Sequence, residues 1–169
     1  MATFSCNSQS IKNKNSFPNY NHNKFDSLGQ KTGLWLEDNG MQEVYFKSNK
    51  RNGIFKSYYP NNGKLHCLGE YKDDDPVGTW YYFNESSEIK CIEKTIEINT
   101  DLSFIDKSGE RRTPDHKSYL IWYYPDGTIK EEGIVLYSES IEIDFVKYGK
   151  WKYYNKSGVL TKIEENRNK

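Results

Sequence analysis

Residues 149–160 read Gly-Lys-Trp-Lys-Tyr-Tyr-Asn-Lys-Ser-Gly-Val-Leu, a phrase made of a glycine, aromatic residues, a short turn and an aliphatic residue. Variants of this phrase recur along the chain, and the six units begin at residues 33, 53, 78, 100, 119 and 149. The copies that begin at 100 and 119 are the weakest. A recurring period of this kind indicates a repeat protein, in which each unit buries its apolar side only against its neighbours. Such an array favours a binding surface over a catalytic pocket.

Each unit has the composition of a β-hairpin. Trp, Tyr and Phe favour strands, and the segments 61–63, 125–127 and 156–158 supply turn residues that end in Gly. The longest unit contains an alternating apolar series, which predicts longer strands or an additional hairpin; its members are Val135, Tyr137, Ile141, Ile143 and Phe145. We therefore predict an all-β protein, an elongated array of about six antiparallel β-hairpins that form one long twisted sheet.

Two sets of aromatic residues recur at matching places in the units. The first set is predicted to stack between hairpins, with Trp80 and Trp151 buried; it consists of Trp35, Phe55, Trp80 and Trp151. The second set is predicted to lie on an exposed face and to bind a partner; it consists of Tyr58, Tyr81, Tyr123 and Tyr153. Arg111 and Arg112 lie in the most polar break of the array and are predicted to form the rim of the same site.

Composition and motifs argue against several classes of function. The 169 residues carry 24 Lys and Arg against 24 Asp and Glu, so the formal net charge is zero. A nucleic-acid binder normally has a basic excess, so nucleic acid is not a predicted partner. The sequence contains no HExxH, CxxC, GxSxG or phosphate-binding glycine loop, and its three His are dispersed. We therefore predict a protein that is not an enzyme and that uses no cofactor or metal.

The first 30 residues differ in composition from the rest. Asn, Ser, Lys and Gln dominate residues 1–30, which predicts a disordered polar tether. The repeat domain is placed at 31–165 and a charged tail at 166–169. Cys6 follows Ser5 and precedes a polar linker, which resembles the lipid-bearing Cys of a bacterial lipoprotein. Cys6 is thus a lipidation candidate, and the alternative is an ordinary thiol. If Cys6 is acylated, the protein is expected at the cell envelope; if Cys6 is not acylated, the protein is expected in the cytoplasm.

Two further cysteines lie inside the array. Cys67 and Cys91 occupy matching places in successive hairpins. Such places are two strands apart, about 9–10 Å, which is beyond disulfide reach. Both are predicted to be small apolar packing residues. The run Asp73-Asp74-Asp75 lacks the spacing of a calcium loop and is predicted to be a solvated turn.

The repeats resemble the MORN-type family, and in particular its bacterial variant in YwqK-like antitoxin proteins. The resemblance covers residues 33–165, and the segments 53–65, 69–82 and 149–160 carry it most clearly. It implies an elongated sheet of successive antiparallel hairpins that offers a broad face to a partner. It also implies an interaction scaffold, since such arrays serve as scaffolds and some are antitoxins.

The leading hypothesis is a non-enzymatic protein-binding module, most concretely an antitoxin or immunity protein that neutralises a toxin by binding it. The alternative is an envelope-anchored scaffolding lipoprotein that uses Cys6 and the tether. Direct binding to a membrane surface is disfavoured by the zero net charge. The predicted partner is therefore another protein, and a membrane enters only through a lipid anchor at Cys6.

Overall fold

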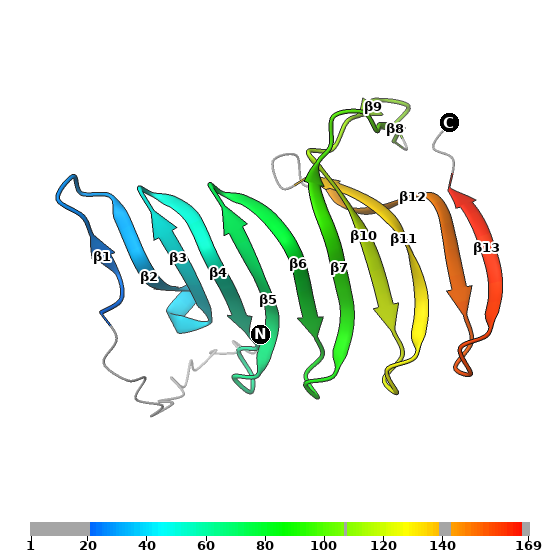
Figure 1. Ribbon diagram of the computed structural model, residues 1–169, viewed down its shortest axis with the longest axis horizontal. Coiled ribbons are helices and arrows are strands. Elements are labelled where there is room, and N and C mark those ends of the chain that lie inside the picture. The colour runs from blue at the N-terminus through cyan, green and yellow to red at the C-terminus, as the bar shows by residue number, and fades with distance from the viewer. Residues whose placement is uncertain (1–20, 107, 139–142, 167–169) are drawn as a thin grey trace, which may run out of the picture.

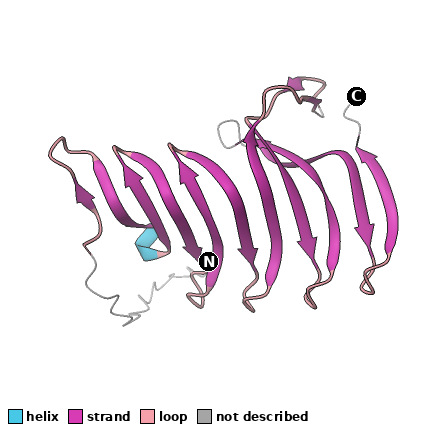
Figure 2. Ribbon diagram, viewed as in Figure 1, coloured by secondary structure: helices cyan, strands magenta, loops and turns pink. Residues whose placement is uncertain are grey.

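The computed structural model describes residues 21–106, 108–138 and 143–166. The protein is all-β, and eleven strands form one open antiparallel sheet in which chain order and spatial order agree (Figures 1 and 2). These strands are β1 (Lys24–Phe25), β2 (Lys31–Glu37), β3 (Gln42–Lys47), β4 (Lys50–Tyr58), β5 (Leu65–Lys72), β6 (Asp75–Phe83), β7 (Ile89–Ile98), β10 (His116–Tyr123), β11 (Ile129–Ser138), β12 (Ile143–Tyr154) and β13 (Leu160–Asn166). The predicted elongated sheet of hairpins is confirmed.

The turn residues form the hairpins as their chemistry predicts. The segments 61–63, 125–127 and 156–158 lie in the turns that join β4 to β5, β10 to β11 and β12 to β13. In the last of these turns the Asn155 side-chain oxygen accepts hydrogen bonds from the backbone N–H groups of Ser157 and Val159, both at 3.0 Å. Asn favours such turns because its side chain can accept backbone hydrogen bonds locally. Asp73 and Asp74 also form a turn, between β5 and β6, and Asp75 begins β6.

The unit that begins at residue 100 departs from the array. It forms a hairpin of its own, β8 (Phe104–Ile105) with β9 (Arg111–Arg112), outside the large sheet. β7 pairs directly with β10, and the small hairpin projects beyond their ends (Figure 1). The Asn99 amide explains how the chain leaves and returns, because it donates hydrogen bonds to the carbonyls of Leu102 at 2.7 Å and Pro114 at 2.8 Å. The prediction that this unit belongs to the sheet is therefore wrong.

The longest unit contains longer strands, as one of the two predicted alternatives requires. β11 has 10 residues and β12 has 12. Ile141 lies outside the described residues. At the N-terminal side, β1 pairs with β2, so the sheet begins before residue 31, where the tether was predicted to end. Residues 1–20, which include Cys6, and 167–169 also lie outside the described residues.

Much of the core lies along one face of the sheet, where large indoles cover glycines, and Ile121 and Leu136 are buried on the opposite face. A Cβ atom at Gly69 would lie 2.1 Å from the Trp80 ring, and one at Gly133 would lie 2.6 Å from the Trp151 ring. Trp80 is 5 % exposed and Trp151 is fully buried, which confirms the predicted stacking positions. Burying a large aromatic side chain contributes several kcal/mol to stability. We call this side of the sheet the tryptophan face.

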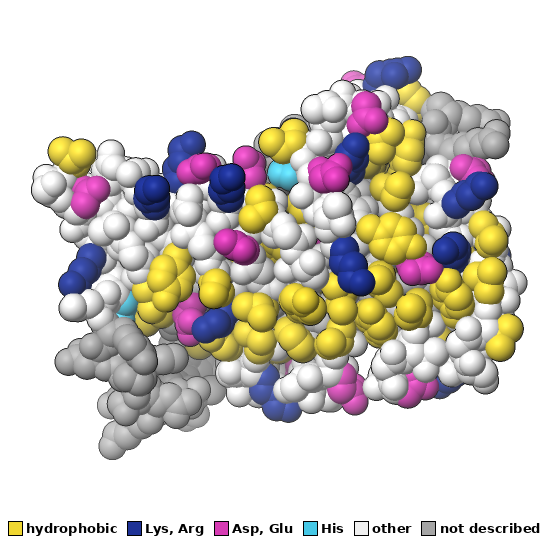
Figure 3. Space-filling view, in the orientation of Figure 1, with side chains coloured by type: hydrophobic (Ala, Val, Ile, Leu, Met, Phe, Trp, Pro, Cys, Tyr) yellow, Lys and Arg dark blue, Asp and Glu magenta, His cyan; other side chains and the backbone are white. Residues whose placement is uncertain are grey.

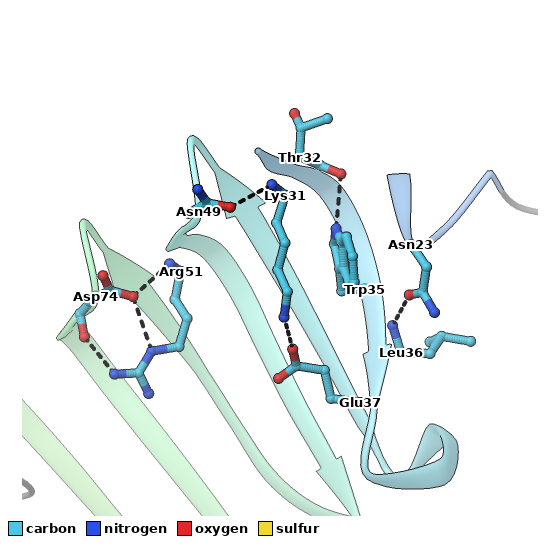
Figure 4. Close-up of polar contacts among 9 residues, drawn as sticks. All are labelled: Asn23, Lys31, Thr32, Trp35, Leu36, Glu37, Asn49, Arg51 and Asp74. Carbon is cyan, nitrogen blue, oxygen red and sulfur yellow. Dashed lines mark hydrogen bonds and ion pairs between the residues drawn. The ribbon is translucent and has the colours of Figure 1, made fainter. Parts of the chain in front are cut away.

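Polar side chains connect consecutive hairpins along the ladder (Figure 4). Asp74, in the turn between β5 and β6, accepts a hydrogen bond from the Arg51 backbone N–H of β4 at 2.8 Å. Asn49, in the turn between β3 and β4, accepts one from the Lys31 N–H of β2 at 2.7 Å. Within β2, the Lys31 ammonium also pairs with Glu37 at 2.7 Å. Each of these two turns is thereby fixed to the strand that precedes its own hairpin.

Candidate protein interface

The side of the sheet opposite the tryptophan face carries one continuous row of side chains. Because directly paired residues of adjacent strands point to the same side, the strand register defines this row. From β2 to β13 its members are Leu36, Glu43, Lys56, Leu68, Tyr81, Ile92, Ile121, Glu132, Lys152 and Ile163. We call this side the tyrosine face and this series its central row.

The middle of the central row is apolar. Leu68, Tyr81, Ile92 and Ile121 occupy the four consecutive strands β5, β6, β7 and β10. Figure 3 shows a band of hydrophobic side chains that crosses the strands near one edge of the sheet, where turns join β4 to β5, β6 to β7, β10 to β11 and β12 to β13. A sheet face of a soluble protein is usually polar where nothing covers it. Ile121 is 6 % exposed, and Leu68, Tyr81 and Ile92 are half-buried, so these three side chains form the accessible part of the row. An apolar band on this side indicates a surface for association.

A charged pair borders the apolar middle on the N-terminal side. The Glu43 carboxylate accepts hydrogen bonds from the Lys56 ammonium at 2.9 Å and from the Tyr58 hydroxyl at 2.7 Å. Burial raises the pKa of Glu43, but the two hydrogen bonds more than offset this and hold the pKa below its usual value. The carboxylate is therefore charged at neutral pH. Burial, together with the same contact, raises the pKa of Tyr58.

A matching charged pair borders the apolar middle on the C-terminal side. The Glu132 carboxylate accepts a hydrogen bond from the Tyr154 hydroxyl at 2.7 Å, and the Lys152 ammonium lies 3.5 Å away. Burial raises the pKa of Glu132, but hydrogen bonds from Tyr154, Tyr119 and Lys152 hold it below its usual value. The two borders therefore repeat one arrangement, with Glu on one strand and Lys-x-Tyr on the next.

Three of the four predicted tyrosines lie on the tyrosine face, and the fourth does not. Tyr58 reaches Glu43, Tyr81 lies in the central row, and Tyr123 lies near Glu132. Tyr153 lies on the tryptophan face, where its hydroxyl donates to Glu164 at 2.8 Å. The prediction of one shared face is wrong for Tyr153, because this residue is two positions after Trp151 and strand side chains alternate.

The two predicted arginines lie away from this surface. Both belong to β9 of the projecting hairpin. Arg112 is held by Asp106 at 2.7 Å and by Glu110 at 2.6 Å, and Arg111 donates to the Ser103 hydroxyl at 3.1 Å. The eight residues of β10 separate this hairpin from Tyr123, a distance of roughly 24 Å. Arg111 and Arg112 therefore do not form a rim around the tyrosines, contrary to the prediction.

The tryptophan face contains a buried carboxylate that was not predicted from the sequence. Glu93 is 1 % exposed, and its carboxylate accepts hydrogen bonds from Ser118 at 2.7 Å and from Tyr82 at 3.1 Å. Burial raises the pKa of Glu93, although these hydrogen bonds oppose the effect. Glu93 pairs in the ladder with Leu120 of β10, where other units place an indole, so the carboxylate has room. The side chain is enclosed and is a structural group of the core.

The predicted packing cysteines are also enclosed in the core. Cys67 and Cys91 are buried free thiols that flank Tyr82, their common neighbour in the ladder. Burial raises the pKa of each thiol to about 12. Neither thiol is therefore a nucleophile at neutral pH.

Comparison with protein-family models and with curated proteins gave no match. Among the described residues, no cluster of three or more His, Cys, Asp or Glu side chains is arranged to hold a metal ion. The same residues contain no helix with the length and apolar character needed to cross a membrane.

Proposed function

We propose that this chain is a non-enzymatic protein-binding repeat module of the MORN type, and most concretely an antitoxin that neutralises a toxin by binding it. The central row of the tyrosine face carries the proposal. Its apolar middle is bordered on both sides by Glu–Lys pairs, at 2.9 Å and 3.5 Å. Protein interfaces combine an apolar centre with a polar border in this way.

The side chains of this face suit protein recognition. Tyr81 is half-buried between Leu68 and Ile92, so its ring is held in place before a partner arrives. A preorganised ring loses little conformational entropy on binding. Tyr residues in the centre of an interface often contribute strongly to binding, because they bury a large area and keep a polar end. The charged borders give direction to the association rather than most of its affinity.

The test is binding by the full chain and two variants. Proteins captured from native extract by the full chain are identified and purified, and their affinity is measured against Tyr81→Ala/Tyr123→Ala and against Tyr153→Ala. The double variant is expected to bind at least about 30-fold more weakly. Tyr153→Ala, on the other face, is the matched control and is expected to bind normally.

Two results contradict the proposal. Equal affinity of the double variant and the full chain would remove the tyrosine face from the binding site. Reproducible substrate turnover by the purified chain would contradict a non-enzymatic role. For the antitoxin form, addition of the full chain is expected to abolish the activity of the captured toxin, while the double variant is expected to leave that activity intact.

A further inference from the structure

The central row of the tyrosine face has a charge order that is complementary to its own reverse. From β3 to β12 it runs Glu, Lys, four apolar residues, Glu, Lys. Read from β12 to β3, it runs Lys, Glu, four apolar residues, Lys, Glu. Reversal therefore exchanges the sign at each charged position and leaves the apolar middle in place. A surface with this order matches a second copy of itself that is turned end for end.

We propose that a second copy of this chain docks on the tyrosine face, with a two-fold axis that runs along the strands between β6 and β7. The inference rests on the proposed function, since it names a second partner for the same protein-binding face, so a docked second copy and a bound toxin exclude each other. A two-fold axis in this position makes β3 face β12 and β4 face β11. Glu43 then faces Lys152 of the second copy, and Lys56 faces Glu132 of the second copy.

The apolar positions match under the same rotation. Leu68 on β5 faces Ile121 on β10, and Tyr81 on β6 faces Ile92 on β7. Each contact occurs twice, because a two-fold interface is built from the same patch on both copies. The four strands in the middle therefore bring only apolar and aromatic side chains together along the central row.

A second row, two residues further from the turns that join β4 to β5 and β10 to β11, is matched at its outer positions, while its middle carries Glu70 on β5, Lys94 on β7 and Tyr119 on β10. It contains Ile54 on β4 and Ile134 on β11, which face each other under the rotation. It also contains Tyr45 on β3 and Tyr148 on β12, which likewise face each other. Ile54 is 52 % exposed and Ile134 is 38 % exposed. The docked copy covers both side chains, and removal of exposed apolar surface from water favours association.

The charged borders are available to a second copy. The Lys56 and Lys152 side chains are 39 % and 47 % exposed, whereas their Glu partners are largely covered. In the docked pair each lysine therefore keeps its own carboxylate and approaches that of the other copy. The four charges at each end alternate in sign, which stabilises this orientation and disfavours the unreversed one.

The area of the patch is sufficient for a stable dimer. Eight strands from β3 to β12 span about 38 Å at ~4.8 Å per strand, and five residues along each strand span about 17 Å. The product is roughly 650 Å² per copy and about 1,300 Å² in total, within the range of specific interfaces. Two twisted sheets also pack face to face in known folds with their strands nearly aligned.

The test uses charge reversal and sedimentation of the full chain. Lys56→Glu places Glu opposite Glu132 at both ends of a homodimer, and Glu132→Lys places Lys opposite Lys56. Each variant alone is expected to dimerise at least about tenfold more weakly than the full chain. A 1:1 mixture of the two variants is expected to form a heterodimer, because Glu at position 56 then faces Lys at position 132 and the other end is unchanged.

Two further variants complete the design. Lys162→Glu makes the same charge change on the tryptophan face and is expected to leave dimerisation unchanged. Ile54→Glu introduces a charge at a position that the single chain exposes, so it is expected to fold normally and to sediment as a monomer. Thermal unfolding of each variant, followed by circular dichroism, separates loss of dimer from loss of fold.

Three outcomes overturn the inference. The full chain remains a monomer at high micromolar concentration, or the mixture of reversed variants associates no better than either alone, or Lys162→Glu weakens the dimer as much as Lys56→Glu does. A monomer that still captures another protein through Tyr81 and Tyr123 would contradict the dimer and leave the proposed function standing. A dimer that captures no other protein would contradict the antitoxin role and support the inference.

Discussion

Replacement of Gly69 by Ala is expected to destabilise the fold through one contact, with the Trp80 indole. The added Cβ would lie 2.1, 2.3 and 2.6 Å from three ring carbons, so the ring must move by more than 1 Å. Phe55 and Tyr71 pack against the same indole, with ring centroids at 5.5 and 5.0 Å, and restrict that movement. Gly69 does not have a positive φ, so the cost is steric and not conformational. Overpacking costs about 1–3 kcal/mol, and the lower entropy of the unfolded chain returns about 0.4–1 kcal/mol.

A double-mutant cycle separates this contact from other effects. Gly69→Ala is expected to cost about 2 kcal/mol, and Trp80→Ala roughly 3–5 kcal/mol. In Gly69→Ala/Trp80→Ala the Cβ occupies space that the indole has left, so the pair is expected to cost no more than Trp80→Ala alone. The free energies of unfolding come from urea titrations followed by circular dichroism. Costs that add to within ~0.5 kcal/mol would refute the reasoning, because independent sites add in this way.

Three further predictions concern buried titratable groups. The raised pKa of Glu93 means that the folded protein holds this proton more tightly than the unfolded chain, so its contribution to stability falls as pH rises from about 4.5. Glu93→Gln is expected to flatten the dependence of the melting temperature on pH between about pH 4.5, near the ordinary pKa of a Glu carboxyl, and neutrality. An unchanged slope would contradict the raised pKa of Glu93. Glu93→Ala is expected to destabilise the fold, because Ser118 and Tyr82 lose their acceptor. The Cys67 and Cys91 thiols, with pKa values of about 12, are expected to resist alkylation at neutral pH until denaturant is added. Peptide mapping by mass spectrometry measures the labelling of each cysteine. Rapid labelling of either thiol in the folded protein would contradict the burial of that thiol.

The hairpin array could be predicted from sequence because its signals are local. Turn residues at 125–127 and 156–158 fix where strands reverse, and the aromatic slot of Trp80 and Trp151 fixes which side is buried. The unit that begins at residue 100 has a correct turn signal and forms a hairpin. Whether this hairpin pairs with β7, however, depends on which other strand can pair with the free edge of β7. β10 occupies it instead, which no local pattern reveals.

The face of each tyrosine could have been predicted by counting from the nearest indole. Tyr81 follows Trp80 by one residue and points to the opposite side, whereas Tyr153 follows Trp151 by two and points to the same side. The positions of the arginines could not be obtained in this way, because they lie beyond the strand ends on a hairpin that leaves the sheet.

The site under each indole also has a sequence signal. The fourth residue after the first aliphatic residue of the second strand is Gly69, Glu93, Gly133 or Glu164 in successive sheet hairpins. Glycine stands where an indole of the next strand covers it, as at Gly69 and Gly133. Glu93 stands where the next strand offers Leu120, and β13, which contains Glu164, is the last strand of the described ladder. The pattern is visible in one sequence, but its cause requires the register.

The strict neighbour-to-neighbour order of the sheet makes the chain modular in length. Since each strand of the ladder pairs only with the strands beside it, gain or loss of one hairpin shifts later units without changing their internal pairing. Loss of β6 and β7 would remove Tyr81 and Ile92 together and bring the two charged borders two positions closer. The spacing between the borders is thus a length that insertion or deletion of whole hairpins can adjust, so partner choice in such a chain can change in steps of one repeat while the individual contacts stay the same.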